Sequence, residues 1–396
     1  MIHPTDIRYL DYHVPPHKEV GFMARVLILG GYGNFGKRIA ENLGKAHPGL
    51  ELLIAGRSLG RAERLCAELQ PIGAAGTLFQ PVRLDIDSPA FPDELAALGP
   101  SVVIHTSGPF QGQDYRVPRA CIQAGAHCID LADGRRYVCD IRSLDIEARA
   151  RGVLVVSGAS SVPGLSSTVI DHFRGEFSRL DAIDFAIAPG NKAEVGEATL
   201  KGILSYTGHP FPVLANGRWQ ERRGWMDARR VDFGGPVGRR WLANIDIPDL
   251  ELFPERYASV RSVKFQAGLE LPLLHHCMVA MAALARVGLV ADWSSWAAPM
   301  LKARQPLMAF GTDIGGMRIE LTGAGRDFRP KRLVWNLYAE NGIGPCIPTL
   351  SAIILAGKLL RGELAERGAL PCLGLFSLAD FDAEAAPLGI YHRVSP

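Results

Sequence analysis

The residues best suited to chemistry near the start of this sequence are glycines, and the ligand they suit is a phosphate. Gly31, Gly33 and Gly36 form a GxGxxG motif between an apolar run, RVLILG, and a segment with helical periodicity. Such glycines allow a tight turn, a close approach of the backbone to a pyrophosphate, and close packing of helix on strand. Backbone amides from Asn34 and Phe35 onward would then bind the diphosphate at the helix start. The motif predicts a dinucleotide site.

The end of the second apolar run distinguishes the two nicotinamide dinucleotides. NAD-binding domains usually carry Asp or Glu there, whose carboxylate binds both ribose hydroxyls and repels a 2′-phosphate. This sequence has Arg57 and Ser58 instead, and a guanidinium beside a hydroxyl can bind that phosphate. We predict NADP(H) as the cofactor, the alternative being that Arg57 is a solvated loop charge. Asp85, after the third run, is assigned to the adenine side, although an ordinary turn aspartate would fit equally well.

Small residues follow the fourth apolar run, SVVIHT. Ser107, Gly108 and Pro109 would stand at the carboxyl end of a strand, near the point where ligands bind in doubly wound sheets. We therefore expect this loop to pass close to the nicotinamide ribose.

A hydride transfer also needs one group that handles a proton. Our candidates are Asp133 and Tyr115 on the cofactor edge of the sheet, with His127 and Asp130 behind them. Each has a structural alternative: Tyr115 packs its helix, His127 is a hydrogen-bonded core histidine, and Asp130 caps a turn.

A sheet is needed to position these residues. The sequence from residue 25 to 157 shows the alternation of strands and helices that is typical of such a sheet. Six continuous apolar runs alternate there with helical segments, as in strands that are covered on both faces. The expected helices span residues 35–46, 60–69, 91–98, 115–124 and 138–151. The fold class is α/β, with a Rossmann doubly wound parallel sheet.

After Pro163 the pattern changes to hairpin-like segments and carries all six tryptophans, which predicts a second, mixed α+β domain for substrate binding and dimerisation. We expect a C-terminal helix to pack back on the first domain. The predicted units are an N-terminal extension over 1–23, with Met23 as a candidate start, the NADP-binding domain over 24–160, the second domain over 161–345, and the C-terminal helix and tail over 346–396.

Composition narrows the class of protein. The formal charge of +2 favours neither nucleic acid nor an anionic membrane as a general partner. The seven cysteines are scattered without a CxxC pair, and no HExxH motif occurs, so we expect no disulfide framework, no metal site and a cytoplasmic location. The longest apolar stretch, 269–291, contains charged residues and is interpreted as a buried amphipathic helix; a membrane-surface contact is the alternative to stable membrane insertion.

The motifs GGYGNFG, AGRS, VVIHTSGPFQGQDYRVPRACIQAGAHCIDLADGRRYV and VVSGASSVPGLSS together resemble the saccharopine dehydrogenase-like oxidoreductases. The resemblance is specific over residues 24–175 and looser beyond. It implies a Rossmann domain paired with a mixed substrate and dimerisation domain, and hydride transfer with a nicotinamide cofactor, often at a carbon-nitrogen bond. The family also includes enoyl reductases that act on lipids. One departure is Thr106-Ser107, where many relatives have cysteine.

We therefore expect an NADP(H)-dependent oxidoreductase that acts on an imine, an amine or a carbonyl carbon of a small metabolite, in a homodimer. One alternative is an enoyl reductase for an apolar substrate, which the tryptophans would suit, and another is a non-catalytic dinucleotide-binding regulatory protein. The arginine-rich segment 218–240 would either clamp substrate carboxylates or form a solvated hairpin.

Overall fold

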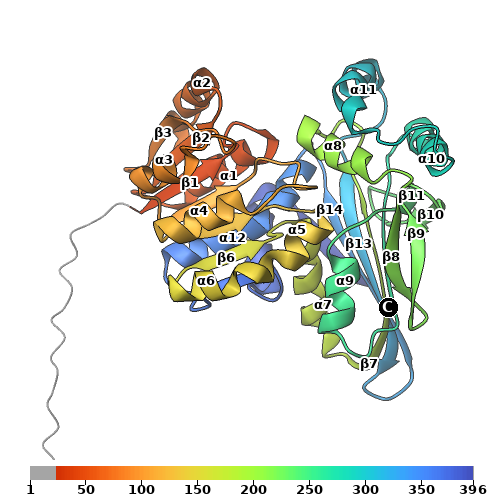
Figure 1. Cartoon of the computed structure of the whole chain (residues 1–396). Helices are drawn as coiled ribbons and strands as arrows, with labels where there is room; N and C mark the ends of the chain where they lie inside the picture. Colours follow the sequence, from red (N-terminus) through yellow and green to blue (C-terminus); the bar gives the residue numbers. More distant parts are fainter. Residues whose placement is uncertain (1–23, 396) are drawn as a thin grey trace, which may run out of the picture.

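The computed structural model describes residues 24–395, which form two seven-stranded sheets, a short two-stranded sheet and their helices. Figure 1 shows the first sheet and its helices beside a second layer of strands. The predicted extension over residues 1–23, with the candidate start at Met23, lies outside the described residues.

The first sheet is parallel throughout, as its continuous apolar runs predicted. Its order, β15-β6-β5-β4-β1-β2-β3, changes direction between β1 and β4, where ligands bind in such sheets. The predicted Rossmann fold is confirmed. Its strands are β1 (Arg25–Leu29), β2 (Glu51–Gly56), β3 (Leu78–Arg83), β4 (Val102–His105), β5 (His127–Asp130), β6 (Leu154–Ser157) and β15 (Gly368–Pro371).

The helices between these strands lie close to the predicted ranges, with one correction. The single helix expected over 138–151 is instead α5, a 3₁₀ segment and α6. Ile141 and Leu144, both fully buried, lie in the 3₁₀ segment, whose three-residue turn places them on one face. The helices are α1 (Asn34–Ala46), α2 (Leu59–Leu69), α3 (Phe91–Leu98), α4 (Arg116–Ala124), α5 (Arg135–Cys139) and α6 (Asp145–Ala150).

The second sheet is mixed and largely antiparallel, as predicted. Its order is β10-β11-β12-β7-β13-β14-β16, and β12 pairs with β7 in parallel. The predicted hairpin is β13 and β14, which pair from Gly315 with Ala339 to Ala324 with Pro330. The strands are β7 (Phe177–Ala188), β10 (Arg229–Asp232), β11 (Arg239–Asn244), β12 (Ser262–Ala267), β13 (Gly315–Gly325), β14 (Pro330–Ala339) and β16 (Tyr391–Ser395); β8 (Pro210–Ala215) and β9 (Arg218–Arg223) form a separate hairpin.

The long apolar stretch folds differently from our expectation. It forms α10, which is shorter than residues 269–291, and only His275, Met278 and Ala282 of this helix are buried. The expected buried amphipathic helix is present only in part, because one stripe of α10 is buried and much of its remaining surface is exposed. Within residues 24–395 no helix is long and apolar enough to cross a bilayer. The helices of this half are α7 (Ser166–Arg174), α8 (Glu197–Ser205), α9 (Asp249–Arg256), α10 (Pro272–Arg286), α11 (Ala297–Arg304), α12 (Ile347–Leu360) and α13 (Leu378–Ala385).

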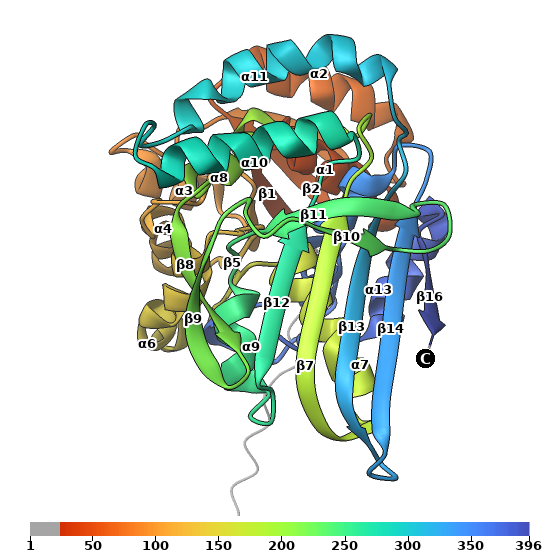
Figure 2. The same cartoon turned by 90° about the vertical axis from the view of Figure 1, so that its right-hand side faces the viewer.

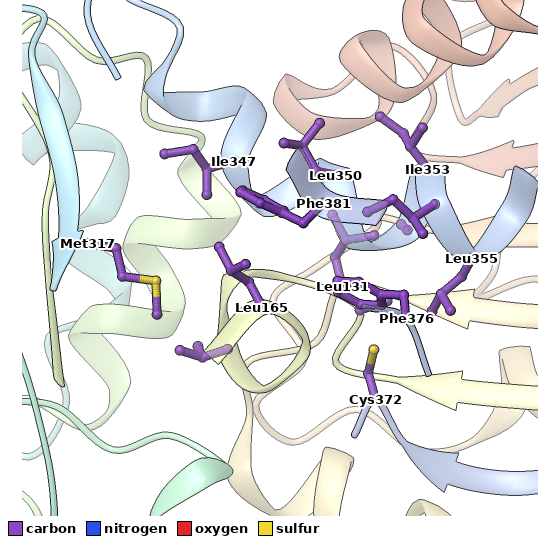
Figure 3. Close-up of a cluster of buried hydrophobic side chains, with 14 of the residues drawn as sticks. Leu131, Leu165, Met317, Ile347, Leu350, Ile353, Leu355, Cys372, Phe376 and Phe381 are labelled. Carbon is purple, nitrogen blue, oxygen red and sulfur yellow. The ribbon is translucent and has the colours of Figure 1, made fainter. Parts of the chain in front are cut away.

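One hydrophobic core runs through both halves of the molecule. Helix α12 contacts α1, β4 and β5 of the first half, and β15 completes the first sheet beside β6. Figure 3 shows Leu350 and Ile353 of α12 in one cluster with Leu131, which follows β5, and with Met317 of β13. The two sheets are therefore held against each other by shared packing.

Candidate active site

The glycine loop has the shape that a pyrophosphate requires. Gly30 turns the chain after β1 with a φ of 74°, a conformation that favours glycine. A Cβ on Gly36 would lie 2.3 Å from the carbonyl oxygen of Gly30, so a side chain there would push the helix off the turn. Helix α1 then starts at Asn34 with no side-chain cap and no acidic residue in its first turn. Its amides and dipole suit an anion, which fits the diphosphate of a dinucleotide.

The end of β2 offers a cation at the expected position. Arg57 is exposed, and Ser58 donates its backbone N–H to the hydroxyl of Tyr32, 2.9 Å away. The guanidinium of Arg61 lies 4.6 Å from the centroid of the Tyr32 ring. The structure thus gathers Arg57, Ser58, Arg61 and Tyr32 at one strand end, where two guanidiniums and the Ser58 hydroxyl could hold a 2′-phosphate.

Asp85 lies in a turn after β3. Its Oδ1 accepts the backbone N–H of Asp87 at 3.1 Å, and Asp87 in turn pairs with Arg116 at 2.7 Å. The ordinary turn role that we left open is thus present, and the assignment of Asp85 to the adenine side stays a prediction.

The loop after β4 is held in place by a side chain that sequence reasoning did not single out. Gln113 donates from Nε2 to the carbonyl oxygens of Ser107 and Pro109, both at 2.8 Å. Its Oε1 lies 3.3 Å from Nε2 of His105, and burial lowers the pKa of this fully buried histidine to about 4. A neutral imidazole and an amide therefore shape the Ser107–Pro109 loop without adding charge.

Asp130 joins the ends of β5 and β6. Its Oδ1 accepts from the backbone of Ala132 and Gly158 and from the hydroxyl of Ser157, each at 2.9 Å. Burial raises the pKa of Asp130 to about 6, and these hydrogen bonds oppose the rise. Among the described residues its Oδ2 has no partner. Asp130 is best explained as a positioning residue for the sheet edge.

Among the candidates for proton transfer, Asp133 is hydrogen-bonded to a side-chain amide at the carboxyl edge of the sheet. Gln111 donates from Nε2 to its Oδ1 at 3.0 Å, and burial raises the pKa of Asp133 above its usual range. A Cβ on Gly202 would lie 2.8 Å from Oε1 of Gln111, so α8 packs directly on this pair. Gln111 was visible in the loop sequence, but nothing there indicated its partner.

The other two proton-handling candidates are less well placed. Tyr115 donates its hydroxyl to the carbonyl oxygen of Tyr137 at 2.9 Å, and burial raises its pKa to about 12, which fits the packing role. His127 begins β5, at the opposite end of the strand from Asp130 and the cofactor loops. Its Nδ1 accepts the backbone N–H of Leu154 at 2.9 Å. This placement fits the alternative of a hydrogen-bonded structural histidine, and a role of His127 in proton transfer stays a prediction.

A cavity of about 440 Å³ opens beside the glycine loop. Asn34 and Phe35 of α1 and Ser161 after β6 line one part, and most of the rest is lined by the end of β7 and the loop after it, by α8, α10, α11 and β13, and by the start of α12. Its apolar lining includes Leu200, Ile203, Trp225, Leu269, Leu274, Met278, Met300, Leu301, Leu307, Met317 and Ile347.

Three of the four charged residues that line the cavity in the described part of the chain, Glu194, Glu270 and Arg304, are engaged by other groups of the protein, and the fourth is Asp313. Arg304, its only lining cation among the described residues, donates to the carbonyl oxygens of Asn191 and Ala193. Glu270 accepts from the backbone of Asn191 and Thr312 and pairs with Arg240 at 3.2 Å. The cavity thus offers mainly hydrocarbon to a ligand.

The second half reaches the glycine loop through Glu194. Its carboxylate pairs with Lys37 at 2.9 Å and Arg38 at 3.0 Å, both in α1. Its carbonyl oxygen accepts from Nδ2 of Asn34 at 3.2 Å. No motif identified Glu194 as a partner of the loop, since the contact joins residues far apart in the chain.

The arginines of the segment 218–240 do not line the cavity, although Trp225 of this segment does. Arg223 pairs with Glu221 in β9, Arg229 pairs with Asp184 in the second sheet, and Arg240 is joined to Glu270. These pairings agree with the alternative of a solvated hairpin whose arginines pair with acidic residues of the protein. They do not support a clamp for substrate carboxylates. Within residues 24–395 no group of His, Cys, Asp and Glu side chains is arranged to hold a metal ion.

Comparison with known proteins gives the following matches. Residues 26–156 match the family model of the saccharopine dehydrogenase NADP binding domain. The fold is similar to that of apo saccharopine dehydrogenase (L-Glu forming) from Saccharomyces cerevisiae, with a TM-score of 0.64, 15% identity, and 94% of this chain and 99% of that chain covered. A looser match is amine dehydrogenase from Mycobacterium smegmatis, with a TM-score of 0.45, 12% identity and coverage of 90% and 96%. The search of curated proteins gave no match.

Proposed function

We propose that this chain, whose residues 26–156 match the saccharopine dehydrogenase NADP binding domain, is an NADP-dependent oxidoreductase of the saccharopine dehydrogenase-like type and that its substrate is largely apolar. The observation that carries the proposal is the cavity of about 440 Å³ that begins at Asn34 and Phe35 and is lined mainly by hydrocarbon side chains. Such a cavity stabilises a ligand in proportion to the apolar surface it removes from water.

The chemistry follows from what the cofactor and the chain would each supply. NADP(H) supplies or accepts the hydride at its nicotinamide ring. The amides at the start of α1 would hold the diphosphate, Arg57 and Ser58 the 2′-phosphate, and the Ser107–Pro109 loop the nicotinamide ribose. The chain must then bind the apolar part of the substrate, orient the reacting carbon and handle one proton.

We propose Asp133 as the group that handles the proton. Its raised pKa keeps the carboxyl protonated to a higher pH than usual, as a proton donor requires. Helix α8 lies between Asp133 and the cavity, since Gly202 packs on Gln111 whereas Leu200 and Ile203 line the cavity. In our proposal α8 shifts when the substrate binds, which brings the Gln111 and Asp133 pair to the reacting group.

The cavity favours the apolar-substrate alternative over a small, charged metabolite. An amino acid with two carboxylates would need free cations, and the only lining cation among residues 24–395, Arg304, is bonded to backbone carbonyls. The acceptor that we propose is a carbonyl carbon or a carbon-carbon double bond conjugated to a carbonyl, on a substrate with a long hydrocarbon part. The homodimer and the cytoplasmic location remain as predicted from the sequence.

A substrate panel tests the proposal. Purified protein with NADPH is given matched pairs of short and long compounds in three classes: enoyl esters, ketones, and imines formed from keto acids with amines. We expect NADPH oxidation to increase with chain length in one of the first two classes. Turnover restricted to short, charged imines would reject the apolar substrate but leave the oxidoreductase assignment intact.

A further inference from the structure

The exposed apolar side chains of this protein are concentrated on one end of its second half. Six of its large, exposed hydrophobic residues fall between residues 272 and 310, a segment that we call the helical cap; it holds α10, the following loop and α11. Figures 1 and 2 show α10 and α11 together at the upper end of the second sheet. The six are Leu273, Leu284, Val287, Leu289, Trp296 and Phe310.

These side chains are strongly exposed. Leu273, Val287, Leu289 and Phe310 have 66%, 67%, 73% and 61% of their surface in contact with solvent. A helix that is apolar on most of its faces is normally buried in a core or covered by a partner. In α10 only His275, Met278 and Ala282 are buried. The remaining apolar surface therefore indicates an interaction site.

The charges of the helical cap favour an anionic partner. Between residues 272 and 310 the sequence has three cations, Arg286, Lys302 and Arg304, and one acidic residue, Asp292. Arg304 points inward to backbone carbonyls, which leaves Arg286 and Lys302 exposed beside the apolar side chains. The Asp292 carboxylate accepts from the backbone and hydroxyl of Ser294, at 2.8 and 2.5 Å. Cations next to exposed Leu, Trp and Phe are the composition of a segment that lies on a membrane surface.

The same helices cover the apolar cavity. Leu274 and Met278 of α10 and Met300 and Leu301 of α11 line it from the inside, while Leu273 and Trp296 face solvent. A hydrocarbon chain that passes between α10 and α11 would thus meet apolar surface on both sides of the helical cap. A second copy of the chain docked here would place like charges against each other and would cover this route.

We propose that the helical cap docks on an anionic lipid surface, with Leu273, Leu284, Val287, Leu289, Trp296 and Phe310 inserted among the headgroups and with Arg286 and Lys302 facing the lipid phosphates. The proposal rests on the surface and not on the proposed substrate, because docking requires neither cofactor nor turnover. It also gives an apolar substrate a path from the lipid to the cavity.

Vesicle co-sedimentation of the full chain tests this surface. We expect binding to vesicles of phosphatidylcholine with phosphatidylglycerol, weaker binding to phosphatidylcholine alone, and a decrease of at least tenfold on raising the salt concentration. The variant Leu289→Asp should lower binding to the anionic vesicles at least tenfold. The matched control is Ile146→Asp on α6, since Ile146 is 82% exposed but lies outside the helical cap, and it should bind as the unmodified chain does. NADPH titration of both variants shows that each is folded.

Several results would overturn the proposal. They are equal binding by Leu289→Asp and the unmodified chain, an equal loss in Ile146→Asp, and no sedimentation with either vesicle. Analytical ultracentrifugation without lipid tests whether a second copy of the chain binds the helical cap instead. A dimer that Leu289→Asp dissociates would assign this surface to dimerisation and overturn the proposal. Reduction of a water-soluble substrate by Leu289→Asp at the unmodified rate separates this test from that of the proposed function.

Discussion

Gln111 donates a hydrogen bond of 3.0 Å from its side-chain Nε2 to the Oδ1 of Asp133, at the carboxyl end of the first sheet. The bond fixes the direction of a carboxyl group whose pKa is raised by burial. If this group donates the proton, activity must fall as the pH rises through its pKa, because only the protonated form can act.

Replacing this group gives the first test. The variant Asp133→Asn keeps the size of the side chain but cannot transfer a proton, and we expect kcat to fall by about 100-fold or more with little change in NADPH affinity. The pH profile should lose its alkaline limb. His127→Gln is the control, since His127 lies at the far end of β5, and its kcat should be unchanged. An unaltered pH profile in Asp133→Asn would assign the proton to another group.

The second prediction concerns the choice of cofactor. In Arg57→Asp a carboxylate replaces the exposed cation at the end of β2, and it should lower NADPH affinity at least tenfold, or ~1.4 kcal/mol, while affecting NADH little. Fluorescence titration with both cofactors measures the difference. Arg151→Asp makes the same change of charge on a loop before β6 and should leave both affinities as they are. Equal losses of NADPH and NADH affinity in Arg57→Asp would contradict the assignment.

Filling the cavity gives the third prediction. Leu274 lines the cavity from α10, whereas its neighbour Leu273 faces solvent. In Leu274→Trp the added ring should lower kcat/KM for long-chain substrates at least tenfold and for short ones much less, because only the long chains need the occupied volume. Leu273→Trp is the matched control. A uniform loss for long and short substrates would instead indicate a displaced helix.

The fourth prediction concerns the joint between the two halves. Arg135, which starts α5, pairs with Asp246 at 2.8 Å and donates to the carbonyl oxygens of Pro212 and Ile247. Arg135→Met leaves the partly buried Asp246 without its cation and should lower the free energy of unfolding by about 1.5–3 kcal/mol. Urea denaturation of Arg135→Met with Asp246→Leu should show partial recovery. If the double variant is no more stable than Arg135→Met, the unpaired carboxylate of Asp246 is not the cause of the lost stability.

The fifth prediction concerns pH and stability. Asp249 accepts a hydrogen bond of 2.5 Å from the hydroxyl of Ser166, and burial raises its pKa from 3.8 to about 7. The folded chain therefore binds this proton more tightly than the unfolded chain does. As the pH rises from about 4 to 7, the unfolded state holds fewer protons and the free energy of unfolding decreases, by as much as ~4 kcal/mol.

The variant Asp249→Asn isolates that contribution. Its amide oxygen can still accept from Ser166, but it does not titrate, so the variant should gain stability relative to the unmodified chain as the pH rises. Denaturation curves at pH 5 and 8 measure the difference. A constant difference at both values would show that Asp249 titrates alike in the folded and unfolded chains.

The strands and the glycine loop of the first half could largely be predicted from the sequence, because each is encoded by a short, continuous stretch of residues. Continuous apolar runs predicted its strands from β1 to β6, and the glycine motif predicted the loop before α1. The strand β15 was missed, since Gly368–Pro371 is short and pairs with β6 from far along the chain. A four-residue strand is too short to show a hydrophobic periodicity, and its sequence does not indicate which strand it pairs with.

The candidate site was predictable only in part for the same reason. The glycines and Arg57 could be recognised from their residue types and their positions after predicted strands. The structure places them at the same edge of the first sheet. The contacts of Asp133 with Gln111, and of Glu194 with Lys37, depend on how loops and sheets meet, which no local pattern encodes. The exposure of α10 was mispredicted because apolar composition indicates where a helix could be buried and not what covers it.

The pairing of β15 with β6 also has a consequence for biosynthesis. While the polypeptide emerges from the ribosome, the nucleotide-binding half has an open sheet edge at β6 until residues 368–371 have been translated and can dock there. A truncated chain that ends before residue 368 would leave the edge of β6 unpaired, and this edge could pair with strands of other chains. We therefore expect the nucleotide-binding half to complete its folding only late in translation, after β15 has been made.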